Sequence, residues 1–166
     1  HLSQIAGEFS QFANIGNPRN ETFNLNEPLN LITSLHNAGE NLSIIWEPAA
    51  EPIMITADKT HINRLFTNLI QNAIQAVPEN KQGNITVKEK VTDSKVLITI
   101  SDNGNGIPLS LQSKIFTPNF TTKSSGTGLG LAMCKGIVEK TKGDIWFNTK
   151  EGEGTTFFVE LPLAEN

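Results

Sequence analysis

The chain has 166 residues, of which 37% are apolar and 18% charged, and its formal net charge is −4. These values are typical of a soluble globular domain, and the acidic balance without a long basic stripe argues against nucleic-acid binding. One cysteine excludes an internal disulfide framework and a cysteine-based zinc cluster. No apolar run reaches membrane-spanning length, so we expect no membrane contact by this chain. The start at His1, without a signal-peptide pattern, suggests a piece of a longer protein that can hold a transmembrane segment elsewhere.

The first residues predict a helix that stops at Gly16-Asn17-Pro18. Its apolar positions recur at helical spacing and are Leu2, Ile5, Ala6, Phe9, Phe12 and Ala13. Such a helix can pack on its own core, or it can be the end of a longer helix that pairs with a segment outside this chain. We favour the second interpretation, because the point at which the sequence starts is arbitrary.

The next segment predicts short elements in the order strand, helix, strand, strand. The strand covers residues 23–25, and the helix begins at Asn26 as its cap and runs to about Asn37. The two later strands cover residues 42–46 and 53–57, with turn-forming residues between them.

The strongest predicted helix begins at Asp58 as its cap and ends at Pro78. Its apolar stripe consists of Ile62, Leu65, Phe66, Leu69, Ile70, Ala73 and Val77. Asn68 and Asn72 lie one turn apart on the edge of this stripe, although asparagine is a poor helix former. Their amide oxygens are suitable ligands for a largely hydrated magnesium ion, and the alternative is that both side chains are only solvated.

A further strand pair is predicted over residues 84–91 and 95–100, and the second strand leads directly to an acid. The run Val96–Ile100 indicates a buried strand, which places Asp102 at its carboxyl end. Glycines at 104 and 106 remove the side chains that would block close approach of a ligand. An acid beside bare backbone can bind a flat ligand that offers a donor, such as the amino group of adenine.

Three other interpretations of this turn compete. Asn103-Gly104 is a common hairpin turn, but no alternating strand follows and Pro108 interrupts the pattern. A calcium loop of the EF-hand type needs Asp or Asn where Gly104 stands. The third alternative is an ordinary surface loop.

A polar segment from Pro108 to Gly130 predicts a long loop that carries Ile115, Phe116 and Phe120. Long loops in compact domains are often lids, and the apolar residues favour a lid that packs when closed.

The run Ser125-Gly126-Thr127-Gly128-Leu129-Gly130-Leu131 then opens a helix that continues to Val138. Backbone N–H groups at such a helix start suit an anion such as phosphate, and the alternative is a flexible hinge. A hairpin over residues 144–148 and 155–161 closes the chain.

Four motifs therefore stand in order: Asn68 with Asn72, Asp102-Asn103-Gly104-Asn105-Gly106, Gly126-Thr127-Gly128-Leu129-Gly130, and Gly154-Thr155. This order resembles the catalytic ATP-binding domain of bacterial sensor histidine kinases, from about residue 24 to 163. That superfamily includes DNA gyrase, a heat-shock chaperone class and mismatch-repair ATPases. The stretch Phe120 to Lys123 further resembles nitrogen-regulation-type kinases, and the first helix resembles the end of their dimerisation hairpin.

The resemblance implies an α/β fold, a two-layer sandwich in which helices cover one face of a mixed sheet. It implies that Asp102 binds the adenine amino group, that Thr155 supports it through water, and that Gly104 and Gly106 let the base approach. Asn72 would hold Mg²⁺ with help from Asn68. The phosphates of ATP would rest on Gly126, Thr127, Gly128, Leu129 and Gly130, under a lid over about residues 107–127.

Two departures from the family pattern stand out. Many members carry Lys three residues after the magnesium asparagine, where this chain has Gln75; Lys123 in the lid can supply the charge that phosphoryl transfer requires. The phosphate-accepting histidine is also absent, because His1, His36 and His61 do not match its motif.

We therefore expect a protein-histidine kinase fragment, in which residues 1–18 end a dimerisation helix and residues 19–166 bind ATP. It would transfer the γ-phosphoryl group of Mg-ATP to a histidine on a separate hairpin, in a homodimer that serves a response-regulator receiver domain. The resemblance implies a cytoplasmic domain of a parent protein that can be membrane-anchored. The alternatives are an ATP-driven clamp and a nucleotide-sensing pseudokinase. Asn68 counts against the clamp, because gyrase-like hydrolases carry a water-activating Glu there.

Overall fold

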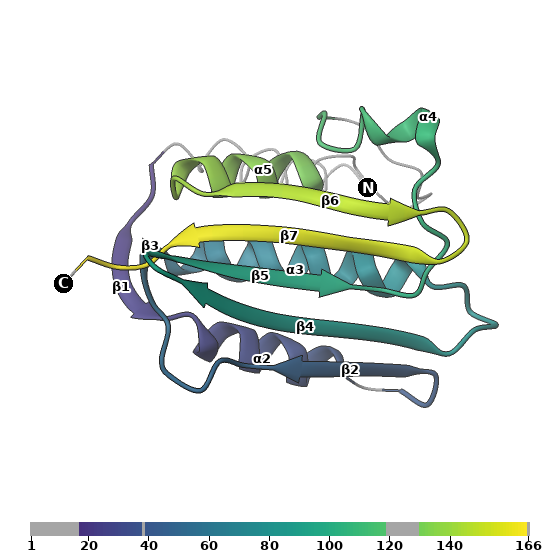
Figure 1. Cartoon of the computed structure of the whole chain (residues 1–166), viewed down its shortest axis with the longest axis horizontal. Helices are drawn as coiled ribbons and strands as arrows, with labels where there is room; N and C mark the ends of the chain where they lie inside the picture. The colour runs from purple at the N-terminus through teal and green to yellow at the C-terminus, as the bar shows by residue number, and fades with distance from the viewer. Residues whose placement is uncertain (1–16, 38, 119–129, 166) are drawn as a thin grey trace, which may run out of the picture.

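The computed structural model describes residues 17–37, 39–118 and 130–165, and these form two layers (Figure 1). One layer is a five-stranded sheet in the order β2-β4-β5-β7-β6. Strands β2 and β4 run parallel and the remaining neighbours are antiparallel, so the sheet is mixed. The strands are β2 (Leu42–Glu47), β4 (Gly83–Thr92), β5 (Lys95–Ser101), β6 (Asp144–Lys150) and β7 (Gly154–Pro162).

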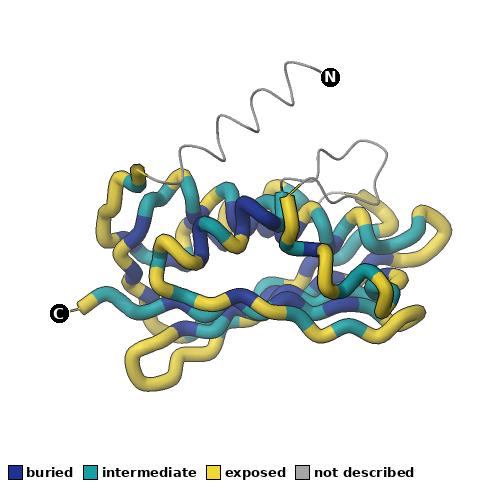
Figure 2. The backbone as a smooth tube through the Cα atoms, turned by 90° about the horizontal axis from the view of Figure 1, so that it is seen from above, coloured by how far each residue is buried: buried dark blue, intermediate teal, exposed yellow. Residues whose placement is uncertain are grey.

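Three helices cover one face of this sheet, and the core lies between the two layers (Figures 1 and 2). They are α2 (Asn26–His36), α3 (Lys59–Ala76) and α5 (Gly130–Lys140). Six apolar residues of α3 are buried, as its stripe predicts: Ile62, Leu65, Phe66, Leu69, Ile70 and Ala73. Each fully buried large side chain contributes about 1.5–3 kcal/mol, which makes α3 the central helix of the core. The expected fold class is confirmed.

Strand β5 is buried on one face, not on both. Val96, Ile98 and Ile100 are buried, whereas Leu97 and Thr99 are half-buried. The predicted buried strand is therefore present, with its buried residues on the face that the helices cover, while the other face of the sheet is open (Figure 1). Asp102 follows directly after the strand. The alternation of side chains along a strand places it on the same face as the buried residues Val96, Ile98 and Ile100.

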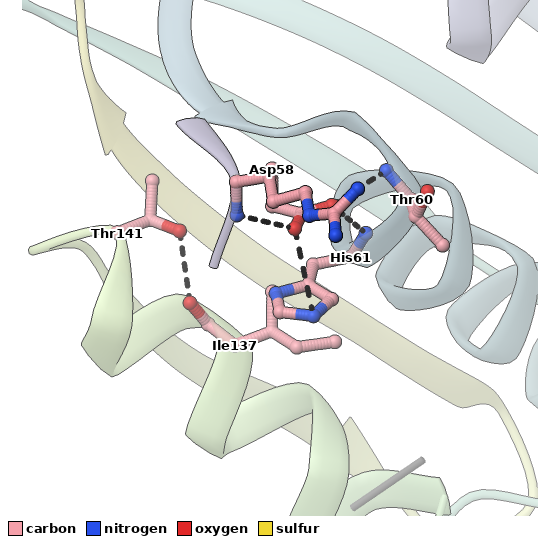
Figure 3. A network of polar contacts seen from close by, with 6 residues as sticks. Asp58, Thr60, His61, Ile137 and Thr141 are labelled. Atoms are coloured by element: carbon pink, nitrogen blue, oxygen red, sulfur yellow. Dashed lines mark hydrogen bonds and ion pairs between the residues drawn. The ribbon is translucent and has the colours of Figure 1, made fainter. Parts of the chain in front are cut away.

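The start of α3 is fixed by Asp58, which confirms the predicted cap (Figure 3). Its carboxylate accepts hydrogen bonds from the backbone N–H groups of Thr60, at 2.9 Å, and His61, at 3.2 Å. The N–H of Arg19 bonds the other carboxylate oxygen at 2.8 Å, and the His61 imidazole points toward it. Burial raises the pKa of Asp58, but these N–H donors and the His61 charge outweigh it and hold the pKa below its ordinary value.

The cap of α2 differs from the prediction, because Asn26 does not cap the helix. Leu25 stands at the N-cap without a side-chain bond. The Asn24 side chain instead accepts hydrogen bonds from the N–H groups of Asn26 and Ile53, each at 3.1 Å. Asn24 ends β1 (Asn20–Asn24), which pairs with β3 (Met54–Asp58) in a separate antiparallel pair. Asn24, two residues before the predicted cap, therefore joins this pair to α2.

The first part of the predicted lid packs on the sheet in this structure. It contains the short helix α4 (Leu109–Gln112), and Ile115 is buried. The ring of Phe116 lies 6.0 Å from that of Phe147 and 6.3 Å from that of Phe157, measured between centroids. Aromatic pairs at this spacing add about 0.5–1.5 kcal/mol each, so residues 107–118 are anchored. Phe120 and the predicted first helix lie outside the described residues. Within the described residues, no helix is long and apolar enough to cross a membrane.

Candidate functional site

The carboxylate of Asp102 is fixed by backbone donors at the end of β5. Its Oδ1 atom accepts a hydrogen bond from the N–H of Gly104 at 2.9 Å and another from Thr155 at 3.2 Å. Burial raises the pKa of Asp102 above its ordinary value, and these two donors and the Lys81 charge oppose the rise without cancelling it. Both bonds from described residues end on Oδ1, so Oδ2 can accept a donor from a ligand.

Thr155 joins Asp102 to the neighbouring strand β6. Thr155 is 5% exposed, and its backbone bonds Asp102 in both directions, because its carbonyl also accepts the Asp102 N–H at 2.9 Å. Its hydroxyl lies 2.8 Å from the hydroxyl of Thr149 on β6. Sequence reasoning missed Thr149, which directly follows the predicted strand 144–148 and which the structure places opposite Thr155 within β6. Its β-branched side chain beside that strand is a detectable signal.

The glycines of the Asp102 loop are required by the protein's own backbone. A Cβ atom on Gly104 would lie 2.4 Å from the carbonyl oxygen of Ala76, at the end of α3. Gly106 has a φ of +75°, and its Cβ would lie 2.5 Å from the carbonyl oxygen of Lys150. The loop is therefore wedged between α3 and the β6–β7 turn. The neighbour that excludes a side chain at Gly104 is backbone, whereas the sequence suggested a ligand.

Asn103 holds the opposite side of the same loop, and sequence reasoning assigned it no role. Its side-chain oxygen accepts the N–H of Asn84 at 2.8 Å, and its amide nitrogen donates to the carbonyl of Gln82 at 2.9 Å. The Lys81 ammonium group donates to the Asn103 carbonyl at 2.7 Å. These bonds tie the loop to the start of β4 and to the segment that precedes it, which also rules out a hairpin turn at 103–104.

Asn68 and Asn72 are half-buried on α3, on the side of the helix that meets α5. A Cβ atom on Gly130, the first residue of α5, would lie 3.7 Å from Oδ1 of Asn68. The structure thus brings the start of α5 against Asn68, while Ala76 at the end of α3 accepts the N–H of Asn105 at 3.2 Å. Helix α3 connects the asparagine pair to the Asp102 loop.

The remaining predicted site residues lie outside the described part of the chain. They are Lys123, Gly126, Thr127, Gly128 and Leu129. Among the described residues, no group of three His, Cys, Asp or Glu side chains is placed to hold a metal ion. The neutral amide oxygens of Asn68 and Asn72 fit a magnesium ion that takes its other ligands from water and phosphate.

These neighbours form an arrangement that can bind a nucleotide between two polar groups. At one end, a half-buried carboxylate offers an acceptor for a base edge. At the other end, the amide of Asn68 on α3 lies beside Gly130 at the N-terminus of α5, where helix geometry favours anions.

A family comparison matches residues 57–165 to the histidine kinase-, DNA gyrase B- and HSP90-like ATPase family. Sporulation kinase C of Bacillus subtilis is 35% identical over 150 residues, which are 88% of this chain and 35% of that protein. The sensor histidine kinase ZraS of Salmonella typhimurium is 35% identical over 168 residues, 98% of this chain and 35% of its own length. The chain therefore spans about a third of the length of each of these two relatives.

Solved structures give the same result. The catalytic domain of histidine kinase ThkA superposes with a TM-score of 0.77 at 36% identity, over 87% of this chain and 95% of that one. Full-length ShkA, solved with AMPPNP, superposes with a TM-score of 0.83 at 22% identity, over 100% of this chain and 36% of that one, which shows the shared fold. The chain belongs to the family of histidine kinase-, DNA gyrase B- and HSP90-like ATPases, as a catalytic ATP-binding domain of the sensor-histidine-kinase type.

Proposed function

We propose that this domain binds Mg-ATP and transfers the γ-phosphoryl group to a histidine on a separate helical hairpin. The observation that supports this best is the Asp102 carboxylate. Its Oδ1 atom is held by two backbone N–H groups, at 2.9 and 3.2 Å, in a half-buried position. A fixed acceptor of this kind selects a base that presents an amino group, because the bond is charge-assisted.

Adenine recognition is assigned to the Asp102 loop and to Thr155. In this proposal, Oδ2 of Asp102 accepts the adenine amino group, and Thr155 supports the base through a bridging water. Gly104 and Gly106 bring the backbone close to the base while they pack against α3 and the β6–β7 turn. The protein's part in the reaction is then to orient ATP.

Phosphate and metal binding are assigned to α3, to the start of α5 and to the segment before it. Asn72 would hold Mg²⁺ with Asn68 beside it, and Mg²⁺ would neutralise charge on the phosphates. The phosphates would rest on residues 126–130, where the N-terminal end of α5 favours anions. Lys123 would supply the positive charge that Gln75 lacks.

The domain boundaries and partners belong to the same proposal. Residues 1–18 would end a dimerisation helix of a homodimer, residues 19–166 would be the ATP-binding domain, and residues 107–127 would cover the nucleotide. A receiver domain would take the phosphoryl group from the histidine. Support comes from a solved complex of the histidine kinase ThkA with the response regulator protein TrrA, which superposes at 29% identity, over 98% of this chain and 48% of that one, with a TM-score of 0.78. The stretch Phe120 to Lys123 supports placement in a nitrogen-regulation-like subgroup.

Phosphotransfer to a supplied acceptor tests the proposal. The chain alone should bind ATP without gaining acid-labile phosphate, because none of its histidines lies in an acceptor motif. Transfer needs the acceptor nitrogen about 3–3.5 Å from the phosphorus, in line with the leaving oxygen. A protein that carries this domain behind its own dimerisation hairpin should therefore become labelled with radioactive ATP.

The alternatives predict other results in the same assay. Release of inorganic phosphate without label on the hairpin would indicate an ATP-driven clamp. ATP binding with neither label nor release would indicate a nucleotide-sensing pseudokinase. Label on the isolated chain would show that the acceptor has been misplaced.

A further inference from the structure

The hydroxyl of Thr149 is shared by three groups around the Asp102 loop. It accepts a hydrogen bond from the backbone N–H of Ile107 at 2.9 Å. It lies 2.8 Å from the Thr155 hydroxyl and 3.2 Å from the carbonyl oxygen of Gly154. A hydroxyl has one proton and two lone pairs, so these three partners use its full capacity.

Two of these partners lead to different parts of the site. Thr155 donates its own N–H to Oδ1 of Asp102. The Thr149 hydroxyl is therefore connected to the carboxylate through one intervening residue, Thr155. Ile107 follows Gly106 directly and begins the segment that continues through α4 to Phe116. That segment is anchored farther along, where Phe116 packs against Phe147 of β6.

Thr149 also stands where β6 and β7 are held in register. It pairs directly with Thr155, and the turn that follows donates the Gly152 N–H to the Asn105 carbonyl at 2.7 Å. The β6–β7 hairpin therefore bonds the backbone of the 105–107 stretch in two places near its turn, through the Gly152 N–H and through one side chain. That side chain is Thr149.

We propose that Thr149 is a positioning residue that couples the base-binding carboxylate to the first residues of the 107–118 segment. This inference rests on the proposed adenine site. When a base binds to Asp102 and Thr155, the Thr149 hydroxyl keeps Thr155 in place through their hydrogen bond. The hydrogen bond from the Ile107 N–H to the same hydroxyl then becomes more stable. Valine has the shape of threonine without the hydroxyl, whereas serine keeps the hydroxyl and loses a methyl group.

Titration of three variants tests the coupling. Thr149→Val should weaken the affinity for adenosine, ADP and ATP by the same factor, because the base is common to all three. We expect a factor of about three to ten, the equivalent of one neutral hydrogen bond, since only the bond to Thr155 acts on the base site. Thr149→Ser should restore the affinity to nearly that of the wild type. Thr56→Val is the matched control, since it removes one hydroxyl from the Thr22–Thr56 pair, at 2.8 Å, in the separate β1–β3 sheet, and it should leave affinity unchanged.

Hydrogen exchange on the wild-type chain provides a measurement that does not depend on a variant folding. Adenosine should slow exchange of the Ile107 amide in the wild type and in Thr149→Ser. Thr149→Val should lose this protection. Unchanged affinity in folded Thr149→Val, a serine variant as weak as the valine variant, or an Ile107 amide insensitive to adenosine would each overturn the proposal.

The same titrations separate this inference from the proposed function. If Asp102→Asn abolishes adenosine binding while Thr149→Val binds normally, the adenine site stands and the role of Thr149 is wrong. If Asp102→Asn binds adenosine normally, the adenine site itself is wrong, and the coupling proposal falls with it.

Discussion

Asp102→Asn separates nucleotide recognition from folding more sharply than removal of the side chain. The asparagine can keep its Oδ1 toward the two N–H groups of Gly104 and Thr155, which lie 2.9 and 3.2 Å from the native oxygen. Its NH₂ group then replaces Oδ2 and meets the adenine amino group donor to donor. A charge-assisted hydrogen bond contributes about 1.5–3 kcal/mol, so ATP affinity should fall at least about ten- to a hundredfold.

Stability should respond in the opposite way in the two variants of this residue. Asp102→Ala leaves the N–H groups of Gly104 and Thr155, two buried residues, without their acceptor, which costs about 1–3 kcal/mol for each donor. Asp102→Asn keeps both bonds and removes a carboxylate whose pKa burial has raised. The asparagine variant should therefore be as stable as the wild type at pH 7, or more stable, while it fails to bind ATP.

The pH dependence gives the sign of this effect. Because the folded-state pKa of Asp102 is raised, the stability linked to its proton is present below the ordinary aspartate pKa and is lost as pH rises through the raised pKa. Thermal unfolding of wild type and Asp102→Asn between about pH 4 and 8 should show the wild type losing stability relative to the variant as pH increases. ATP affinity retained in folded Asp102→Asn, measured by calorimetry, would refute the assignment.

Three further predictions follow from the site. Asn72→Ala should weaken Mg-ATP binding far more than binding of metal-free ATP, and equal losses in two calorimetric titrations would make Asn72 structural. Gly104→Ala should lower unfolding free energy by about 1–3 kcal/mol in denaturant titrations, because its Cβ meets the Ala76 carbonyl, whereas Gly130→Ala, with ordinary contact at 3.7 Å, should not. Protease cleavage within residues 107–127 should slow when a Mg-ATP analogue is added, and equal rates with and without it would contradict a lid.

Local pattern was sufficient to predict most elements. The stripe of α3, the strand pair β4–β5 and the β6–β7 hairpin all follow from residues close together in sequence, and Asp58 caps α3 as predicted. The order of the four motifs identified the family, because that order is a property of the sequence itself. Local pattern failed at the cap of α2, where the Asn24 side chain accepts the N–H of Ile53, which is distant in the sequence and which no local rule pairs with it.

The sequence by itself determined that an acid follows a strand, that glycines surround it and that two asparagines lie on one helix. Tertiary structure decided which of these groups touch: β5 and β7 become neighbours although about 50 residues separate Asp102 from Thr155. It also decided that Gly104 faces Ala76, that Thr149 contacts Ile107, and that Phe116 packs on the sheet. The physical reason is that periodicity fixes which face a residue occupies, whereas strand order and register fix its neighbours, and these depend on packing of the whole core.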